Sequence, residues 1–138
     1  MHLVHWDNWF ASDRGYTVIM NIEELREYCL SKKGVSESFP FDETTLVFKV
    51  MDKMFVLTDQ EGELSINLKC DPDMANELRE KYPAVLPGYH MNKEHWNTVM
   101  IDGSIPERLI RVWIDHSYDL VIRQLPAGKR KRFVKKYT

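Results

Sequence analysis

The stretch Leu64-Ser65-Ile66-Asn67-Leu68-Lys69-Cys70-Asp71-Pro72 contains the junction on which the fold depends. From 64 to 69, apolar and polar side chains alternate, which is typical of a β-strand with one face in water. Asp71 and Pro72 then supply a helix N-cap and a proline at the first helical position, where its missing N–H costs nothing. The pattern therefore predicts a strand that leads into a helix, and Pro83 ends that helix.

Two further strands are expected before this junction. Residues 44–50 alternate in polarity, and residues 54–58 form a second short apolar run. The links at 51–53 and 60–63 are short and rich in turn-forming or polar residues. Together with the strand at 64–69, these segments predict an antiparallel meander.

A helix precedes the meander. Asn21 is an N-cap residue, and Glu24 stands three positions later, which is the spacing of a capping box. The apolar stripe after the cap continues to Lys32, and Gly34 is a natural stop. A helix from 21 to about 32 is therefore expected.

The C-terminal half completes the expected sheet and helices. Residues 83–88 predict a loop or an edge strand, because two prolines and a glycine interrupt the backbone there. Residues 96–101 predict another strand. The last helix opens at 104–106 and runs to about residue 124, with one buried stripe. Pro126 and Gly128 are expected to stop it.

Length and composition restrict the class of protein. The chain has 138 residues, which corresponds to one domain, and 43% of them are hydrophobic, which excludes a wholly disordered chain. No apolar run is long enough to span a membrane, and the N-terminus does not resemble a signal peptide. Cys29 and Cys70 are not in a CxxC pair and indicate free thiols in a reducing compartment. A cytoplasmic location is expected.

The net charge of −2 conceals an asymmetry. The segment 127–138 holds six Lys and Arg and no acidic residue, whereas 1–126 holds the other 13 basic residues against 21 acidic ones, a net charge of −8. The sequence thus predicts an acidic body with a basic C-terminal tail, which we expect to be mobile or weakly packed.

Residues 1–19 differ from the rest of the chain, because they are rich in Trp and His and show no sustained period. We expect Met20 to be the natural start and 1–19 to be an appendage that is not native. The alternative is that Trp6, Trp9 and Phe10 pack on the domain or on a partner, since so much aromatic surface is seldom left in water.

No motif of an enzyme or a metal site is present. The sequence lacks a nucleophile elbow and a phosphate-binding glycine loop, and its histidines have no metal-ligand spacing. Cys29 lies on an apolar helix face, where a buried small side chain is expected. Cys70 could be more exposed, and a helix N-terminus there could lower its pKa, but a structural role is favoured for this residue as well. We expect no catalytic activity, cofactor or metal.

The densest polar and aromatic cluster spans residues 87–98. Its lysine, aromatic and amide groups suit contacts with phosphates or bases. A structural interpretation competes: Trp96 could fill the core while Asn92 and His95 satisfy buried backbone groups. The residues by themselves slightly favour the structural interpretation.

At this cluster the sequence resembles the MmcQ/YjbR family of small bacterial proteins. The segments that carry the resemblance are Ser38-Phe39-Pro40-Phe41-Asp42, Leu68-Lys69-Cys70-Asp71-Pro72, Pro87-Gly88-Tyr89-His90-Met91-Asn92-Lys93, His95-Trp96-Asn97-Thr98-Val99, Asp102-Gly103-Ser104-Ile105-Pro106 and Asp115-His116-Ser117-Tyr118-Asp119-Leu120-Val121. The resemblance implies a two-layer α+β fold in the order α-β-β-β-α-β-β-α, with helices on an antiparallel sheet. The family-like domain is expected over 20–126, between the N-terminal extension and the tail.

Members of this family are commonly labelled DNA-binding, so the resemblance implies a non-enzymatic DNA-binding protein. The residues expected to contact DNA are Lys69, His90, Asn92, Lys93, His95 and Trp96 in the domain and Lys129, Arg130, Lys131 and Arg132 in the tail. The acidic balance of 1–126 counts against this function, because affinity for DNA comes largely from neutralised phosphates.

Two alternatives remain open. The fold also resembles secretion-chaperone-like folds, so the chain could bind a protein or peptide partner or self-associate. A small-ligand pocket lined by His90, Lys93, His95 and Trp96 is the third possibility. A continuous positive strip from Lys69 and Lys93 to the tail would favour nucleic acid, and an exposed apolar groove would favour a peptide or self-association.

Overall fold

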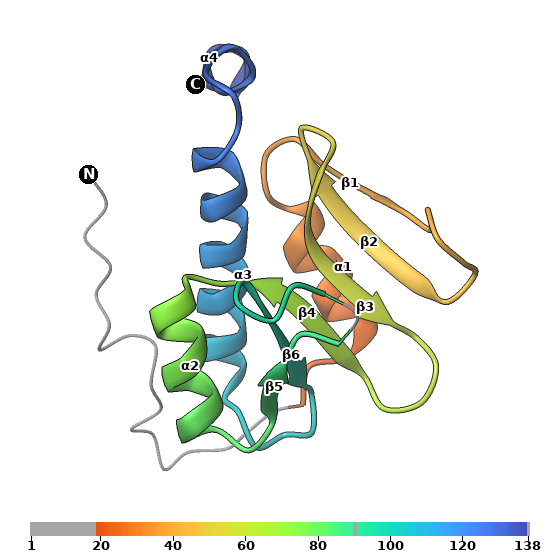
Figure 1. Ribbon diagram of the computed structural model, residues 1–138. Coiled ribbons are helices and arrows are strands. Elements are labelled where there is room, and N and C mark those ends of the chain that lie inside the picture. Colours follow the sequence, from red (N-terminus) through yellow and green to blue (C-terminus); the bar gives the residue numbers. More distant parts are fainter. Residues whose placement is uncertain (1–18, 90, 138) are drawn as a thin grey trace.

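The structure is a computed structural model that describes residues 19–89 and 91–137. Within these ranges the chain forms four helices and one antiparallel sheet (Figure 1). The elements in chain order are α1 (Ile22–Leu30), β1 (Val35–Ser38), β2 (Thr45–Val50), β3 (Lys53–Asp59), β4 (Ser65–Lys69), α2 (Pro72–Lys81), β5 (Val85–Pro87), β6 (Trp96–Met100), α3 (Glu107–Arg123) and α4 (Ala127–Tyr137). The expected α+β class and element order are confirmed, and β1 and α4 are additional elements.

The strands lie in the order β1-β2-β3-β4-β6-β5, and each neighbouring pair is antiparallel. Met51 and Asp52 connect β2 to β3 with φ angles of 50° and 65°, the left-handed conformation of a two-residue hairpin turn. This turn confirms the expected link at 51–53. Strand β5 is a three-residue edge strand, which agrees with one of the two expectations for 83–88.

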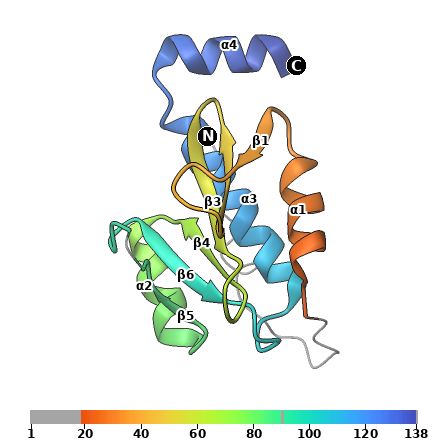
Figure 2. The same cartoon turned by 90° about the vertical axis from the view of Figure 1, so that its right-hand side faces the viewer.

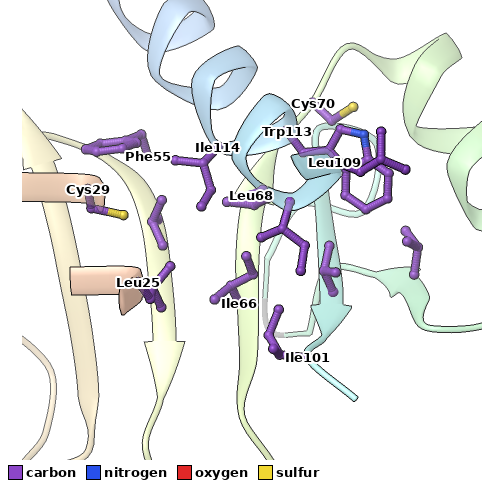
Figure 3. Close-up of a cluster of buried hydrophobic side chains, with 14 of the residues drawn as sticks. Leu25, Cys29, Phe55, Ile66, Leu68, Cys70, Ile101, Leu109, Trp113 and Ile114 are labelled. Atoms are coloured by element: carbon purple, nitrogen blue, oxygen red, sulfur yellow. The ribbon is translucent and has the colours of Figure 1, made fainter. Parts of the chain in front are cut away.

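One face of the sheet and the four helices share a single hydrophobic core, to which α4 contributes Phe133. Leu25 and Cys29 of α1 and Ile114 of α3 lie against the strands, as Figure 3 shows. Helix α2 adds Met74, Ala75 and Leu78 to the same cluster. The opposite face of the sheet carries a smaller apolar cluster of Val47, Leu57 and Trp96.

Helix α1 begins as its sequence predicts. The Asn21 side chain accepts the backbone N–H of Glu24 at 2.8 Å, and the Glu24 carboxylate accepts the Asn21 N–H at 3.3 Å. These two bonds satisfy N–H groups that a helix start leaves free. Met20, directly before the cap, is buried in the core. Of the proposed extension, residues 1–18 lie outside the described residues, including Trp6, Trp9 and Phe10.

The basic tail is a helix that makes few contacts with the rest of the chain, which agrees with the expectation of a weakly packed segment. Residues 127–137 form helix α4, which turns across the end of α3 (Figures 1 and 2). Phe133 is buried, and its ring lies 6.4 Å from that of Tyr118 and 4.9 Å from that of Tyr137. Pro126 stops α3 but also starts α4, because a proline at a helix start loses no hydrogen bond. Its carbonyl accepts the N–H of Arg130 at 3.0 Å.

Candidate functional site

The loop between β5 and β6 is closed by Asn92. The backbone carbonyl of Asn92 accepts the N–H groups of His95 at 3.2 Å and Trp96 at 2.9 Å, and its side-chain oxygen accepts the N–H of Glu94 at 2.9 Å. These bonds pair backbone groups in a segment that has no strand partner. Asn92 therefore organises the loop that carries the polar and aromatic cluster.

Arg79 of α2 forms hydrogen bonds with the same loop and with the start of β6. This residue was not identified from the sequence. Its Nε donates to Oδ1 of Asn97 at 2.6 Å, and its Nη2 donates to the backbone carbonyls of Lys93 and Trp96, the latter at 3.1 Å. Asn97 is buried and also donates to the carbonyl of Ala75 at 3.4 Å. Nothing in the sequence of an exposed helix turn marks Arg79 for this contact.

Two candidate DNA-contacting residues, Lys93 and Trp96, make contacts within the fold. The ammonium group of Lys93 donates to the carbonyl of Gly88 at 3.1 Å, although Lys93 is an exposed residue. Trp96 is buried against Val47 and Leu57 on the sheet, as the structural interpretation expects, so its ring offers no free face to a base. His90 lies outside the described residues.

Lys69 ends β4 beside this loop. It pairs with Trp96 across the sheet, and the next residue, Cys70, donates its N–H to the carbonyl of His95 at 2.8 Å. The Lys69 ammonium donates to Oε1 of Gln124 at the end of α3, at 2.5 Å. Partial burial, together with the nearby charge of Lys53, lowers the pKa of Lys69. The structure thus brings Lys69, His95 and Trp96 together and connects Lys69 to the end of α3.

The remaining candidates lie on α4. Arg130 donates to the backbone carbonyl of Arg123 at 2.9 Å, which joins the start of α4 to the end of α3. Phe133 points inward, so a helix of 3.6 residues per turn places Lys131 and Lys135 on the opposite face. Both are exposed, as is Arg132, and Lys129 is half-buried. The candidates therefore fall into two groups, one around the β5–β6 loop and one on α4.

We use the name basic end for the six Lys and Arg of α4 together with Lys53, Lys69 and Arg123. Helix α4 lies at the same end of the molecule as the β2–β3 turn in Figures 1 and 2. The β3–β4 loop, with Glu61 and Glu63, lies at the opposite end (Figure 1). The six basic residues of α4 are therefore remote from the acidic β3–β4 loop.

His116 has a structural role that sequence reasoning did not assign. Its Nε2 accepts the N–H of Asp71 at 3.2 Å, which requires a neutral ring, and burial lowers its pKa to about 4. The neighbouring Ser117 hydroxyl accepts the N–H of Lys69 at 2.9 Å and donates to the carbonyl of Phe55 at 2.6 Å. The two side chains hold the strand-to-helix junction onto α3.

The cysteines are packing residues. Cys29 and Cys70 are both buried, which confirms the structural interpretation of both and rules out the alternative of an exposed Cys70. Burial raises the pKa of each thiol to about 12, which outweighs any effect of the helix N-terminus next to Cys70. Over residues 19–89 and 91–137, no cluster of three His, Cys, Asp or Glu side chains is arranged for a metal ion. In the same ranges no helix is long and apolar enough to cross a membrane.

Comparison with known proteins identifies the family. The sequence model of the YjbR family matches residues 30–120. The chain belongs to the YjbR family. It is 38% identical to the protein YjbR of Escherichia coli (strain K12) over 116 residues, which cover 83% of this chain and 98% of that protein. It is 31% identical to YyaQ of Bacillus subtilis (strain 168) over 114 residues, which cover 71% of this chain and 95% of that protein.

Solved structures agree with this assignment to the YjbR family. Protein DR2400 of Deinococcus radiodurans superposes with a TM-score of 0.78 at 39% identity, over 83% of this chain and 88% of that one. A Pseudomonas syringae protein superposes with a TM-score of 0.65 at 29% identity, over 73% of this chain and 98% of that one. The names of these relatives state no ligand or activity, so a function has to be argued from the surfaces of this chain.

Proposed function

We propose that this YjbR-family chain binds the phosphate backbone of nucleic acid through its basic end and has a binding rather than a catalytic role. The observation that carries the proposal is helix α4, which holds six Lys and Arg and no acidic residue over Ala127–Tyr137. Neutralisation of phosphates by such side chains, with release of counterions, supplies most of the affinity for nucleic acid in non-specific binding.

The packing of α4 supports the proposal, because it fixes the direction of the charges. Phe133 and Tyr137 pack inward, and the Lys33 ammonium donates to the Tyr137 carbonyl at 2.8 Å. Lys131 and Lys135 therefore project from an anchored helix rather than from a free arm. An ordered basic face loses less conformational entropy when it binds than a disordered tail would.

The surroundings of α4 extend the positive surface toward the domain. Lys69 contacts Gln124, and Arg123 precedes it in the chain, so the charges run from β4 over the end of α3 to α4. Contacts of this kind position a duplex without reading its bases. The proposal is therefore for binding with little sequence preference, with α4 and Lys69 as the contacting residues and the β5–β6 loop as support for Lys69.

A salt series on the full chain tests this function. Binding of a random-sequence DNA duplex is measured by fluorescence anisotropy for the wild type and for the double variant Lys131→Gln/Lys135→Gln. If both side chains contact phosphates, the slope of log K against log salt falls by about 1.8, since each phosphate contact contributes about 0.9.

The matched control is Lys81→Gln/Arg108→Gln, which removes two charges remote from the basic end. The control should retain the wild-type slope. Equal slopes for the α4 variant and the wild type would refute the proposal. Binding to vesicles of anionic lipid with no binding to the duplex would also refute it, since a membrane surface would then be the partner of α4.

A further inference from the structure

The face of the sheet that the helices leave uncovered forms a groove of about 850 Å³. Its floor includes one row of paired residues that crosses four adjacent strands: Leu57 on β3, Asn67 on β4, Thr98 on β6 and Leu86 on β5. Grooves of this volume fall within the range of about 300–1,000 Å³ that is typical of ligand sites. No residue of the basic end is among the described residues that line the groove.

Large apolar side chains stand exposed along this groove. Phe41 is 63% exposed, Tyr89 is 69% exposed and Leu86 is 46% exposed. Scattered exposed apolar residues are normal, but three of them around one apolar hollow mark an interaction surface. Their burial by an occupant would be favourable.

Methionines supply much of the remaining apolar lining. Met54, Met91 and Met100 all line the groove. Methionine is unbranched and flexible, so a surface rich in it adapts to apolar side chains of different shapes. This composition suits a peptide better than a single rigid small molecule.

A hydrogen-bond donor is presented at the centre of the floor. The Thr98 hydroxyl accepts the N–H of Tyr89 at 2.9 Å and donates to Oδ1 of Asn67 at 2.6 Å, because an amide oxygen can only accept. The amide nitrogen of Asn67 then remains as a donor, and within residues 19–89 and 91–137 it has no hydrogen-bond partner. A peptide carbonyl is the matching acceptor.

The charge of the groove selects the occupant. Asp42 and Asp59 line it, and no Lys, Arg or His is among its described lining residues. The N–H groups of Thr45 and Thr44 hold the pKa of Asp42 below its usual value, so this carboxylate stays ionised. Such a surface repels nucleic acid and attracts a cation.

We propose that this groove binds a peptide segment that combines large apolar side chains with Lys or Arg. The apolar side chains would fill the methionine-lined hollow, the cation would lie beside Asp42 and Asp59, and a carbonyl would accept from Asn67. Pro87 has no N–H to donate, so the segment is held by these side chains rather than added to β5 as a further strand.

Labelled peptides on the full chain test the proposal. Three short fluorescent peptides serve as probes: one that alternates Leu and Lys, one in which Glu replaces each Lys, and one in which Ser replaces each Leu. We expect the Leu/Lys peptide to bind at least tenfold more tightly than the other two. Leu86→Ser and Asp59→Asn should each weaken its binding several-fold, because one removes apolar contact and the other removes charge.

Two controls locate the binding. Leu30→Ser changes an exposed leucine on α1, outside the groove, and should leave the affinity unchanged. In ¹³C-methyl spectra the peptide should shift the signals of Met54, Met91 and Met100 but not that of Met74, which is buried in the core.

Failure of all three peptides to bind would overturn the proposal, as would shifts confined to methionines outside the groove. A chain that dimerises through the groove, with Leu86→Ser making it monomeric and no peptide bound, would show that a second copy is the occupant and that the proposal is wrong. The Lys131→Gln/Lys135→Gln variant should bind the Leu/Lys peptide as the wild type does, so this test is independent of the proposed nucleic-acid function.

Discussion

Helix α4 should undock when Phe133 is replaced by alanine. Phe133 is 9% exposed and is the buried side chain of α4, so most of the docking free energy comes from its burial against the domain, where its ring faces that of Tyr118 on α3. Burial of one such side chain stabilises by about 1.5–3 kcal/mol. At about 1.4 kcal/mol for each factor of ten, this corresponds to a protection of α4 against opening of roughly 10- to 150-fold.

Native-state hydrogen exchange measures this quantity directly. In the wild type, amides of Ala127–Tyr137 should show that modest protection, and in Phe133→Ala they should exchange almost as in a free peptide, because an isolated helix of eleven residues is marginal in water. The matched control is Val134→Ala on the same helix, where the side chain is 48% exposed and protection should change little. Unchanged protection in Phe133→Ala would refute the conclusion that α4 is held by this contact.

The slope of log K against log salt for DNA binding should be the same in Phe133→Ala as in the wild type, since every charge is retained.

Three further outcomes are expected. Trp96→Ala should destabilise the fold by about 3–5 kcal/mol in urea unfolding, since the ring is buried; a loss below about 1 kcal/mol would contradict the packing described. Cys29 and Cys70 should resist thiol reagents at neutral pH in the native state and react after unfolding, because burial raises the pKa of both thiols to about 12. The His116 pKa, lowered from 6.5 to about 4, means that the unfolded state binds the proton more readily, so stability should be full above about pH 6.5 and fall between 6.5 and 4. His116→Asn, which can still accept from the Asp71 N–H, should remove this component of the pH dependence; an identical pH profile for the variant would show that other groups cause it.

The strands and the first helices follow from local patterns, whereas β1 and α4 do not. Alternating polarity and short turns place the central meander, and capping residues place α1 and α2. Strand β1 has no apolar repeat; it forms by pairing with β2, and its Glu37 is held by Arg26 of α1, with Nε to Oε2 at 2.9 Å. Long-range contacts of this kind leave no signal in sequence periodicity. Helix α4 was not predicted because Pro126 can either end the helix before it or begin a helix after it. The residue that decides between the two is Phe133, which packs against Tyr118 on α3.

The candidate site shows a similar division. Asn92 and Trp96 can be recognised from sequence as residues that serve the structure, because amides commonly satisfy loop backbones and large aromatic rings are commonly buried. Arg79 could not be found, since its partners become neighbours only when α2 packs beside β6. The sequence shows only that His116 lies in a helix. Its structural role depends on the hydrogen bond that it accepts from the Asp71 N–H, which is visible only in the fold.

These contacts explain why family membership is a sound guide to the fold of this chain and a poor guide to its function. Several residues that carry the resemblance, among them Asn92, His116 and Ser117, hold the β4–α2 junction and the β5–β6 loop in place. The family model ends at residue 120, whereas α4 begins at Ala127. The basic helix is therefore a property of this chain that the match does not cover, and nucleic-acid binding through it has to be tested here rather than transferred from relatives. The groove lies inside the matched range, so peptide binding is the role to test next in other members of the family.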